Sequence, residues 1–165
     1  MSLLRTVFSC VLVSCCLMGA ANAAPRFVDA RDYPASGAGA RAFDQMESSL
    51  IQGFNHVCGD TFCEGEYINY LPLRLTCSVR LDNGVLKSCH WALVGSDTRI
   101  DQGRGALRAQ LTSSICGIPL AGGTLLSTLL ASVEGGDNLH KPLPGTRRSV
   151  YDAISDCLSQ RAGSG

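Results

Sequence analysis

Nine cysteines in a chain of 165 residues limit what this sequence can fold into more than any other feature. Three of the nine lie within the first 16 residues, inside an apolar segment. The other six are spread over the rest of the chain: Cys58, Cys63, Cys77, Cys89, Cys116 and Cys157. An even number of cysteines in an exported chain is typical of disulfides. We therefore expect a small domain held by three cross-links, with no free thiol.

The N-terminus has the pattern of an export signal. A short positive stretch ends at Arg5, an apolar run follows over Thr6–Met18, and a small-x-small cleavage site ends at Ala23. The apolar run is too short for a transmembrane helix. We expect residues 1–23 to be a cleaved signal peptide and the mature chain, without a membrane span, to be periplasmic or extracellular. The alternatives are an uncleaved anchor and a lipoprotein anchored at Cys15, which would leave an odd number of thiols.

Composition narrows the class of protein further. Hydrophobic residues make up 45% of the chain and charged residues 17%, which is ordinary for a globular protein and argues against disorder. Lys plus Arg equals Asp plus Glu at 14 each, so no basic field attracts nucleic acid. We expect a flexible lead-in over residues 24–39, a single globular domain over 40–160 and a frayed tail over 161–165.

Apolar spacing predicts three helices. The first follows Arg41, because its apolar residues recur every three or four positions: Phe43, Met46, Leu50, Phe54 and Val57. A second helical pattern runs from Thr124 to Val133. The third begins at Ser149, which forms a capping-box pattern with Asp152.

Strict alternation predicts an antiparallel meander of three strands. Residues 73–81 and 85–93 alternate around Asp82-Asn83-Gly84, where Gly84 can take the positive φ of a bulged loop. A three-residue loop aligns apolar residues across the pair: Leu81 with Val85, Cys77 with Cys89, Leu75 with Trp91 and Leu73 with Leu93. A third strand follows from Leu107, Ala109 and Leu111 and ends near Cys116. The fold class is therefore α+β, with helices packed on the meander.

Disulfide pairing follows in part from this register. Cys77 and Cys89 lie opposite each other, within reach of a bond. Cys58–Cys63 is preferred for its proximity in the sequence, and Cys116–Cys157 remains by elimination. Six cysteines allow fifteen pairings, so only the first assignment has a geometric basis.

The segment between residues 60 and 70 is the candidate binding site. It groups acidic and aromatic side chains on a loop next to two cysteines: Asp60, Phe62, Glu64, Glu66, Tyr67 and Tyr70. The alternative interpretation is that the aromatics pack on the core while the acids are solvated. An irregular calcium site at Asp60, Glu64 and Glu66 is also open, although position three of an EF-hand loop would be Phe62.

No catalytic arrangement survives inspection of the sequence. Cys89 and His90 are neighbours on a strand and point to opposite faces, so they cannot form a dyad. The sequence has no Gly-x-Ser-x-Gly motif and no zinc-ligand spacing. We therefore expect a non-catalytic binding protein without cofactor or metal, such as an inhibitor, an immunity-type factor or an envelope accessory protein. Its partner would be another protein or an envelope component. The alternative is a small secreted hydrolase of envelope polymer that uses Glu64 or Glu66.

Overall fold

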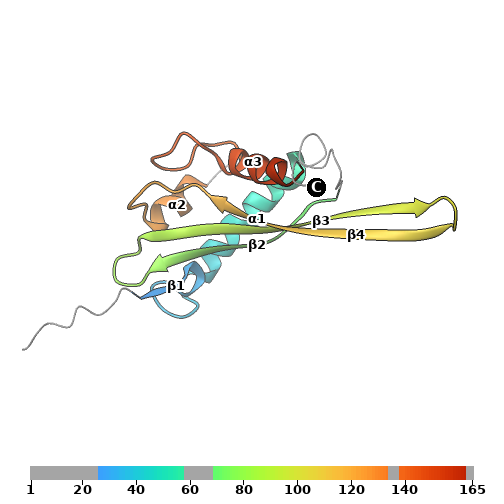
Figure 1. The fold of residues 1–165 in the computed structure, drawn as a ribbon. Coiled ribbons are helices and arrows are strands. Elements are labelled where there is room, and N and C mark those ends of the chain that lie inside the picture. Colours follow the sequence, from blue (N-terminus) through green and yellow to red (C-terminus); the bar gives the residue numbers. More distant parts are fainter. Residues whose placement is uncertain (1–25, 58–68, 134–137, 163–165) are drawn as a thin grey trace, which may run out of the picture.

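The computed structural model describes residues 26–57, 69–133 and 138–162 of the chain. These residues form a four-stranded antiparallel sheet with helices on one face (Figure 1). The strands, in sheet order, are β1 (Phe27–Asp29), β2 (Leu71–Arg80), β3 (Leu86–Asp101) and β4 (Ala106–Ile118). The helices are the 3-10 turn η1 (Ala30–Asp32), α1 (Ala40–Val57), α2 (Leu126–Ser132) and α3 (Val150–Ala162). The α+β class is confirmed, and the expected three-stranded meander is corrected to four strands.

The additional strand lies in the segment that we expected to be a flexible lead-in. Phe27, Val28 and Asp29 pair with the end of β2, and η1 follows directly. Gly39 then passes so close to η1 that an added Cβ would lie 2.2 Å from the carbonyl oxygen of Ala30. Three residues are too few to show alternation, so β1 has no periodic signal in the sequence.

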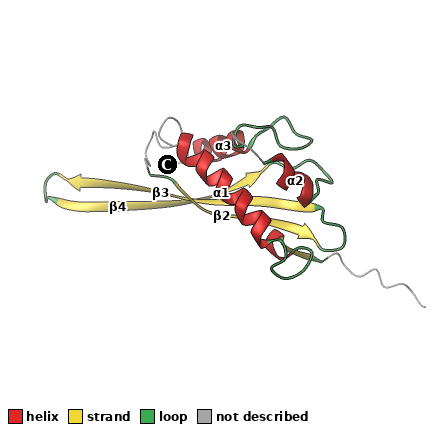
Figure 2. Cartoon of the chain, turned by 180° about the vertical axis from the view of Figure 1, so that it is seen from behind, coloured by secondary structure: helices red, strands yellow, loops and turns green. Residues whose placement is uncertain are grey.

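Helix α1 follows the predicted pattern closely. Phe43, Met46, Leu50 and Phe54 are all buried, while Val57 at the C-terminal end is half-buried against the core. Figure 2 shows α1 crossing one face of the sheet diagonally. We call this the inner face.

The β2–β3 pairing confirms the centre of the predicted register and corrects its two ends. Cys77 lies opposite Cys89 and Leu75 opposite Trp91, as expected. A bulge after Pro72 then leaves Leu73 exposed, although we expected it to point inward. A second irregularity, between Ser78 and Val79, pairs Val79 with Leu86 and lengthens the connection beyond three residues. Bulges insert a residue in one strand only, which alternation in the other strand cannot show.

The core lies between the inner face and the helices. Trp91 is completely buried and makes an edge-on contact with Phe54 of α1, at 6.1 Å between ring centroids. At the start of α3, Ser149 and Asp152 form the predicted capping box, since each side chain accepts a hydrogen bond from the other residue's main-chain N–H. The N-terminal end of α3 therefore has local partners for its main-chain N–H groups.

Strands β3 and β4 extend well beyond the rest of the sheet. Their register is unbroken from Cys89–Ile118 to Asp101–Ala106, whereas β2 pairs with β3 only as far as Val94. Residues 95–112 therefore form a two-stranded ribbon, which projects from the molecule in both views (Figures 1 and 2). We call this ribbon the arm.

Candidate binding surface

The acidic and aromatic loop predicted as a binding site lies almost entirely outside the described residues. Asp60, Phe62, Glu64, Glu66 and Tyr67 fall in the segment 58–68, as do Cys58 and Cys63. Tyr70 is described, and it is half-buried and packed against the core. The loop therefore remains a sequence-based prediction. The described residues that could form a binding surface belong to other parts of the fold.

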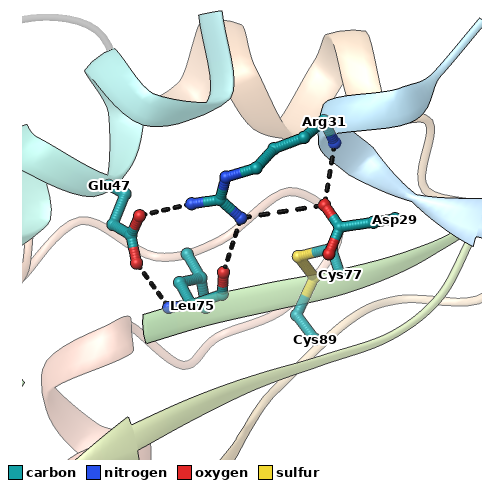
Figure 3. The surroundings of a disulfide bond; sticks show 6 residues. All are labelled: Asp29, Arg31, Glu47, Leu75, Cys77 and Cys89. Atoms are coloured by element: carbon teal, nitrogen blue, oxygen red, sulfur yellow. Dashed lines mark hydrogen bonds and ion pairs between the residues drawn. A yellow bond between two sulfur atoms is a disulfide. The ribbon is translucent and has the colours of Figure 1, made fainter. Parts of the chain in front are cut away.

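The two described disulfides join the sheet internally and to a helix. Cys77–Cys89 links β2 to β3 with 4.1 Å between the Cα atoms, and Figure 3 shows it close to the N-terminal segment. Cys116–Cys157 links β4 to α3, with 5.6 Å between the Cα atoms. Both are pairs that the sequence analysis preferred, and both lie away from the arm.

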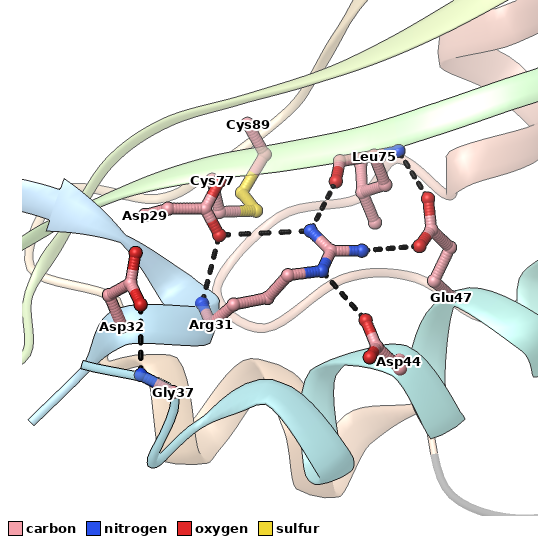
Figure 4. A network of polar contacts seen from close by, with 9 residues as sticks. All are labelled: Asp29, Arg31, Asp32, Gly37, Asp44, Glu47, Leu75, Cys77 and Cys89. Carbon is pink, nitrogen blue, oxygen red and sulfur yellow. Dashed lines mark hydrogen bonds and ion pairs between the residues drawn. A yellow bond between two sulfur atoms is a disulfide. The ribbon is translucent and has the colours of Figure 1, made fainter. Parts of the chain in front are cut away.

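A cluster of charged groups around Arg31 was missed by the sequence analysis. The Arg31 guanidinium donates to Asp44 at 2.7 Å and to the carbonyl oxygen of Leu75 at 3.0 Å, and it also pairs with Glu47 (Figures 3 and 4). Asp29 accepts a hydrogen bond from the Arg31 main-chain N–H at 2.9 Å. Because these groups belong to the N-terminal segment, α1 and β2, the cluster fastens those three elements together.

The contacts around Arg31 hold parts of the fold together. The guanidinium also lies 4.6 Å from the centre of the Phe43 ring, and the Arg31 and Glu47 side chains are each only 13% exposed. The main-chain N–H of Leu75 donates to the second Glu47 oxygen, so both carboxylate oxygens are engaged. A carboxylate held in this way serves as an ion-pair partner and as an acceptor for the main chain.

The same holds for the other carboxylates in the described part of the chain. Each Asp and Glu there has a hydrogen-bond or ion-pair partner, the remaining pairs being Asp32–Gly37, Asp82–Arg80, Asp97–Arg99, Asp101–Arg108, Asp152–Ser149 and Asp156–Arg148. Hydrogen bonds from the main chain and the hydroxyl of Ser149 hold the pKa of the Asp152 carboxyl below its ordinary value. That direction favours the ionised helix cap, and it is opposite to the raised pKa of a general acid.

The outer face of the sheet is where the described residues depart from ordinary surface composition. Among the described residues, the most exposed large apolar side chains lie along it: Ile100 (65%), Leu107 (73%), Leu111 (75%) and Ile115 (67%). The register places Ile100 directly opposite Leu107, with Ala109 and Leu111 following on the same face of β4. We call these four large side chains the outer strip. Leu71 at the start of β2 extends it, since it pairs with Val94 of β3.

The polarity of the two faces reverses between the sheet and the arm. In the sheet, Trp91 and Cys116 face inward and are buried. Along the arm the same inward alternation carries polar residues instead, among them Asp97, Arg99, Asp101, Arg108 and Gln110. The apolar residues of the arm therefore lie on the face that no described helix covers.

A shallow groove marks the end of the outer strip nearest the helices. Ile115 and Gly117 of β4 line one side, and Ala153 and Gln160 of α3 line the other. Arg148 and Asp156 form an ion pair at this groove. Helix α3 thus borders the C-terminal end of β4, where the Cys116–Cys157 disulfide also joins the two elements.

Within residues 26–57, 69–133 and 138–162, no three His, Cys, Asp or Glu side chains come together in a way that could hold a metal ion. None of the helices there is both long enough and apolar enough to cross a membrane. Asp60, Glu64 and Glu66, the residues of the possible calcium site, lie outside these ranges.

Comparison of the chain with protein-family models, with curated proteins and with solved structures finds no match. The function must therefore be argued from the geometry.

Proposed function

We propose that this chain is an exported, disulfide-stabilised, non-catalytic protein that binds another protein through the outer strip. The observation that carries the proposal is the position of Ile100, Leu107, Leu111 and Ile115 on one uncovered face. Together these side chains expose on the order of 500 Å² of apolar surface, a size typical of interaction sites on monomeric proteins. Export is supported by the disulfides, which form in oxidising compartments.

A protein partner fits this surface better than a lipid surface does. The arm carries Asp97, Arg99, Asp101, Arg104 and Arg108, a nearly balanced set with no basic cluster to attract anionic headgroups. The hydrolase alternative depends on Glu64 or Glu66, and no observation on the described residues favours it.

The test is a matched pair of variants in a quantitative capture experiment. Leu107→Thr/Leu111→Thr removes half of the outer strip while keeping residues that favour strands. The Kd is measured for the protein that the wild-type chain captures from the cell envelope. We expect this Kd to rise at least about a hundredfold in the variant, since burying one leucine contributes about 1.5–3 kcal/mol. Unfolding in urea should be almost unchanged, because both side chains are exposed in the free protein.

The control is Leu125→Thr, the same substitution at an exposed leucine outside the strip. It should leave capture unchanged. If the Leu107→Thr/Leu111→Thr protein and the Leu125→Thr protein captured the same partner equally well, the outer strip would not be the binding surface.

A further inference from the structure

The two edges of the sheet are protected very differently. One edge is β1, which is only three residues long and continues directly into η1. The other edge is β4, with 13 residues, paired with β3 on one side only. An edge strand of that length presents a row of unpaired main-chain donors and acceptors, which can bind another strand.

Strand β4 has few of the features that prevent such pairing. Proline, a bulge, or several charged residues would normally interrupt a long edge. The β4 sequence contains no proline, and its register with β3 has no shift. Its one charged residue is Arg108, whose guanidinium is 2.9 Å from the Asp101 carboxylate of the same arm.

The sequence of β4 is complementary to itself in one antiparallel register. A two-fold axis at Ala109 places Leu107 of one copy opposite Leu111 of the other, and Arg108 opposite Gln110. Within residues 105–113, the apolar side chains of the outer face, Leu107, Ala109 and Leu111, then lie opposite apolar side chains. Since the axis is perpendicular to the sheet, both outer strips lie on the same side of the extended sheet.

Neighbouring registers are less favourable. An axis at Arg108 would place two arginines directly opposite each other, and like charges in this position destabilise a strand pair. An axis at Gln110 would place Leu107 opposite Ser113. The Ala109 register is therefore the one that aligns leucine with leucine within the arm without opposing charges.

In the described part of the chain, β4 pairs with β3 alone, and residues 106–111 are all exposed. The pairing would use residues 105–113, whereas the groove beside α3 begins at Ile115. Nine paired residues allow about eight main-chain hydrogen bonds, each of which adds modestly to affinity. The buried area would be on the order of 1,000 Å² in total, at the low end for specific interfaces, and is consistent with micromolar affinity.

We propose that the β4 edges of two copies of this chain pair antiparallel about Ala109 to form a symmetric dimer with a continuous eight-stranded sheet. This goes beyond the proposed function, because it uses the main-chain edge of β4 instead of the side chains of the outer strip. In the dimer, the two outer strips form one larger apolar surface.

Sedimentation equilibrium of the oxidised full chain between about 1 and 500 µM tests the dimer without any partner protein. We expect a monomer–dimer equilibrium with a Kd of about 1–100 µM for an interface of this size. Ala109→Glu places two carboxylates on the axis and should raise the Kd at least tenfold. Ala109→Lys should do the same, whereas an equimolar mixture of the two variants should regain the wild-type affinity within about threefold.

The control is Thr76→Glu, which adds the same charge at an exposed position on β2 away from the edge, and it should not change the Kd. The proposal is overturned if the wild-type chain stays monomeric throughout, or if a dimer persists unchanged in Ala109→Glu. A mixture of the Glu and Lys variants that stays monomeric would also overturn it. None of these results bears on capture by the outer strip, which is measured with a different protein and the Leu107→Thr/Leu111→Thr variant.

Discussion

The sheet and the arm are built from the same two strands, yet they are stabilised in different ways. Between Cys89 and Leu93, β3 has a buried inner face covered by α1 and linked covalently to β2. From residue 95 onward the same strand has only β4 as a partner. On the arm, the side that faces the helices is polar and the outer side carries the apolar residues. In the sheet, the side that faces the helices is apolar. A strand can therefore keep its alternation while its apolar side chains move from the covered side to the uncovered side.

The comparison bears on function because exposed apolar surface has a cost for a free protein. In the sheet, apolar residues stabilise the fold by leaving water. In the arm, Leu107 and Leu111 stay in water and contribute little to folding, so their presence is better explained by an interaction with another molecule. The predictions below test whether stability is concentrated in the sheet, starting with the largest effect.

The largest loss of stability should follow removal of the disulfide between β4 and α3. Cys116→Ala/Cys157→Ala opens a loop of 41 residues, and we expect unfolding free energy to fall by about 4 kcal/mol. Cys77→Ala/Cys89→Ala opens a loop of 12 residues and should cost about 3 kcal/mol. Urea unfolding followed by the fluorescence of buried Trp91 measures both. Losses below about 1 kcal/mol would mean that the cross-links contribute little beyond packing.

A smaller loss should follow disruption of the charged cluster at Arg31. Arg31→Ala leaves Glu47 partly buried without its ion-pair partner, which we expect to cost about 2–3 kcal/mol. The matched control on the arm is Arg99→Ala, which breaks an ion pair with Asp97 in which the Arg99 side chain is 64% exposed and the Asp97 side chain 13% exposed. Because the Arg31 guanidinium loses contacts to Asp44, Glu47 and the Leu75 carbonyl together, whereas Arg99 is mostly solvated, the Arg99→Ala change should cost about 1 kcal/mol or less. Equal losses in the two variants would contradict the difference between sheet and arm.

The smallest effect concerns the helix cap at Asp152 and depends on pH. Because folding lowers the pKa of this carboxyl, the cap stabilises the fold above the ordinary carboxyl pKa, and the contribution is lost as pH falls through the lowered folded value. Asp152→Asn should cost about 0.5–1 kcal/mol at pH 7. The difference from wild type should shrink as pH is lowered from about 5 to 2, as measured by urea unfolding at several pH values. A difference that stays constant over that range would contradict the assignment.

Much of the fold could be predicted from local patterns in the sequence. The buried face of α1, the Cys77–Cys89 alignment and the capping box at Ser149 each depend on residues a few positions apart. Such patterns are visible because helix and strand periods are local properties of the backbone. The role of Arg31 could not be predicted, since its partners Glu47 and Leu75 lie 16 and 44 residues away.

The outer strip, too, could be predicted only in part from local patterns in the sequence. The alternation of Leu107, Ala109 and Leu111 correctly predicted a strand, and four-residue spacing continues to Ile115. The alternation left open which face of the strand is buried. In the structure they are exposed, because β2 ends its pairing at Val94 and the described helices lie on the opposite face.

The sequence by itself determined where the main strands and the three α-helices lie, which cysteines of the first hairpin meet, and that β4 has one apolar face. Only the tertiary structure decided which face of β4 is covered. A period of two residues distinguishes two sides of a strand but contains no information about which side a helix packs against. That choice depends on where α1 and α3 are placed by contacts distant in the sequence, and it leaves the apolar side of the arm free to bind.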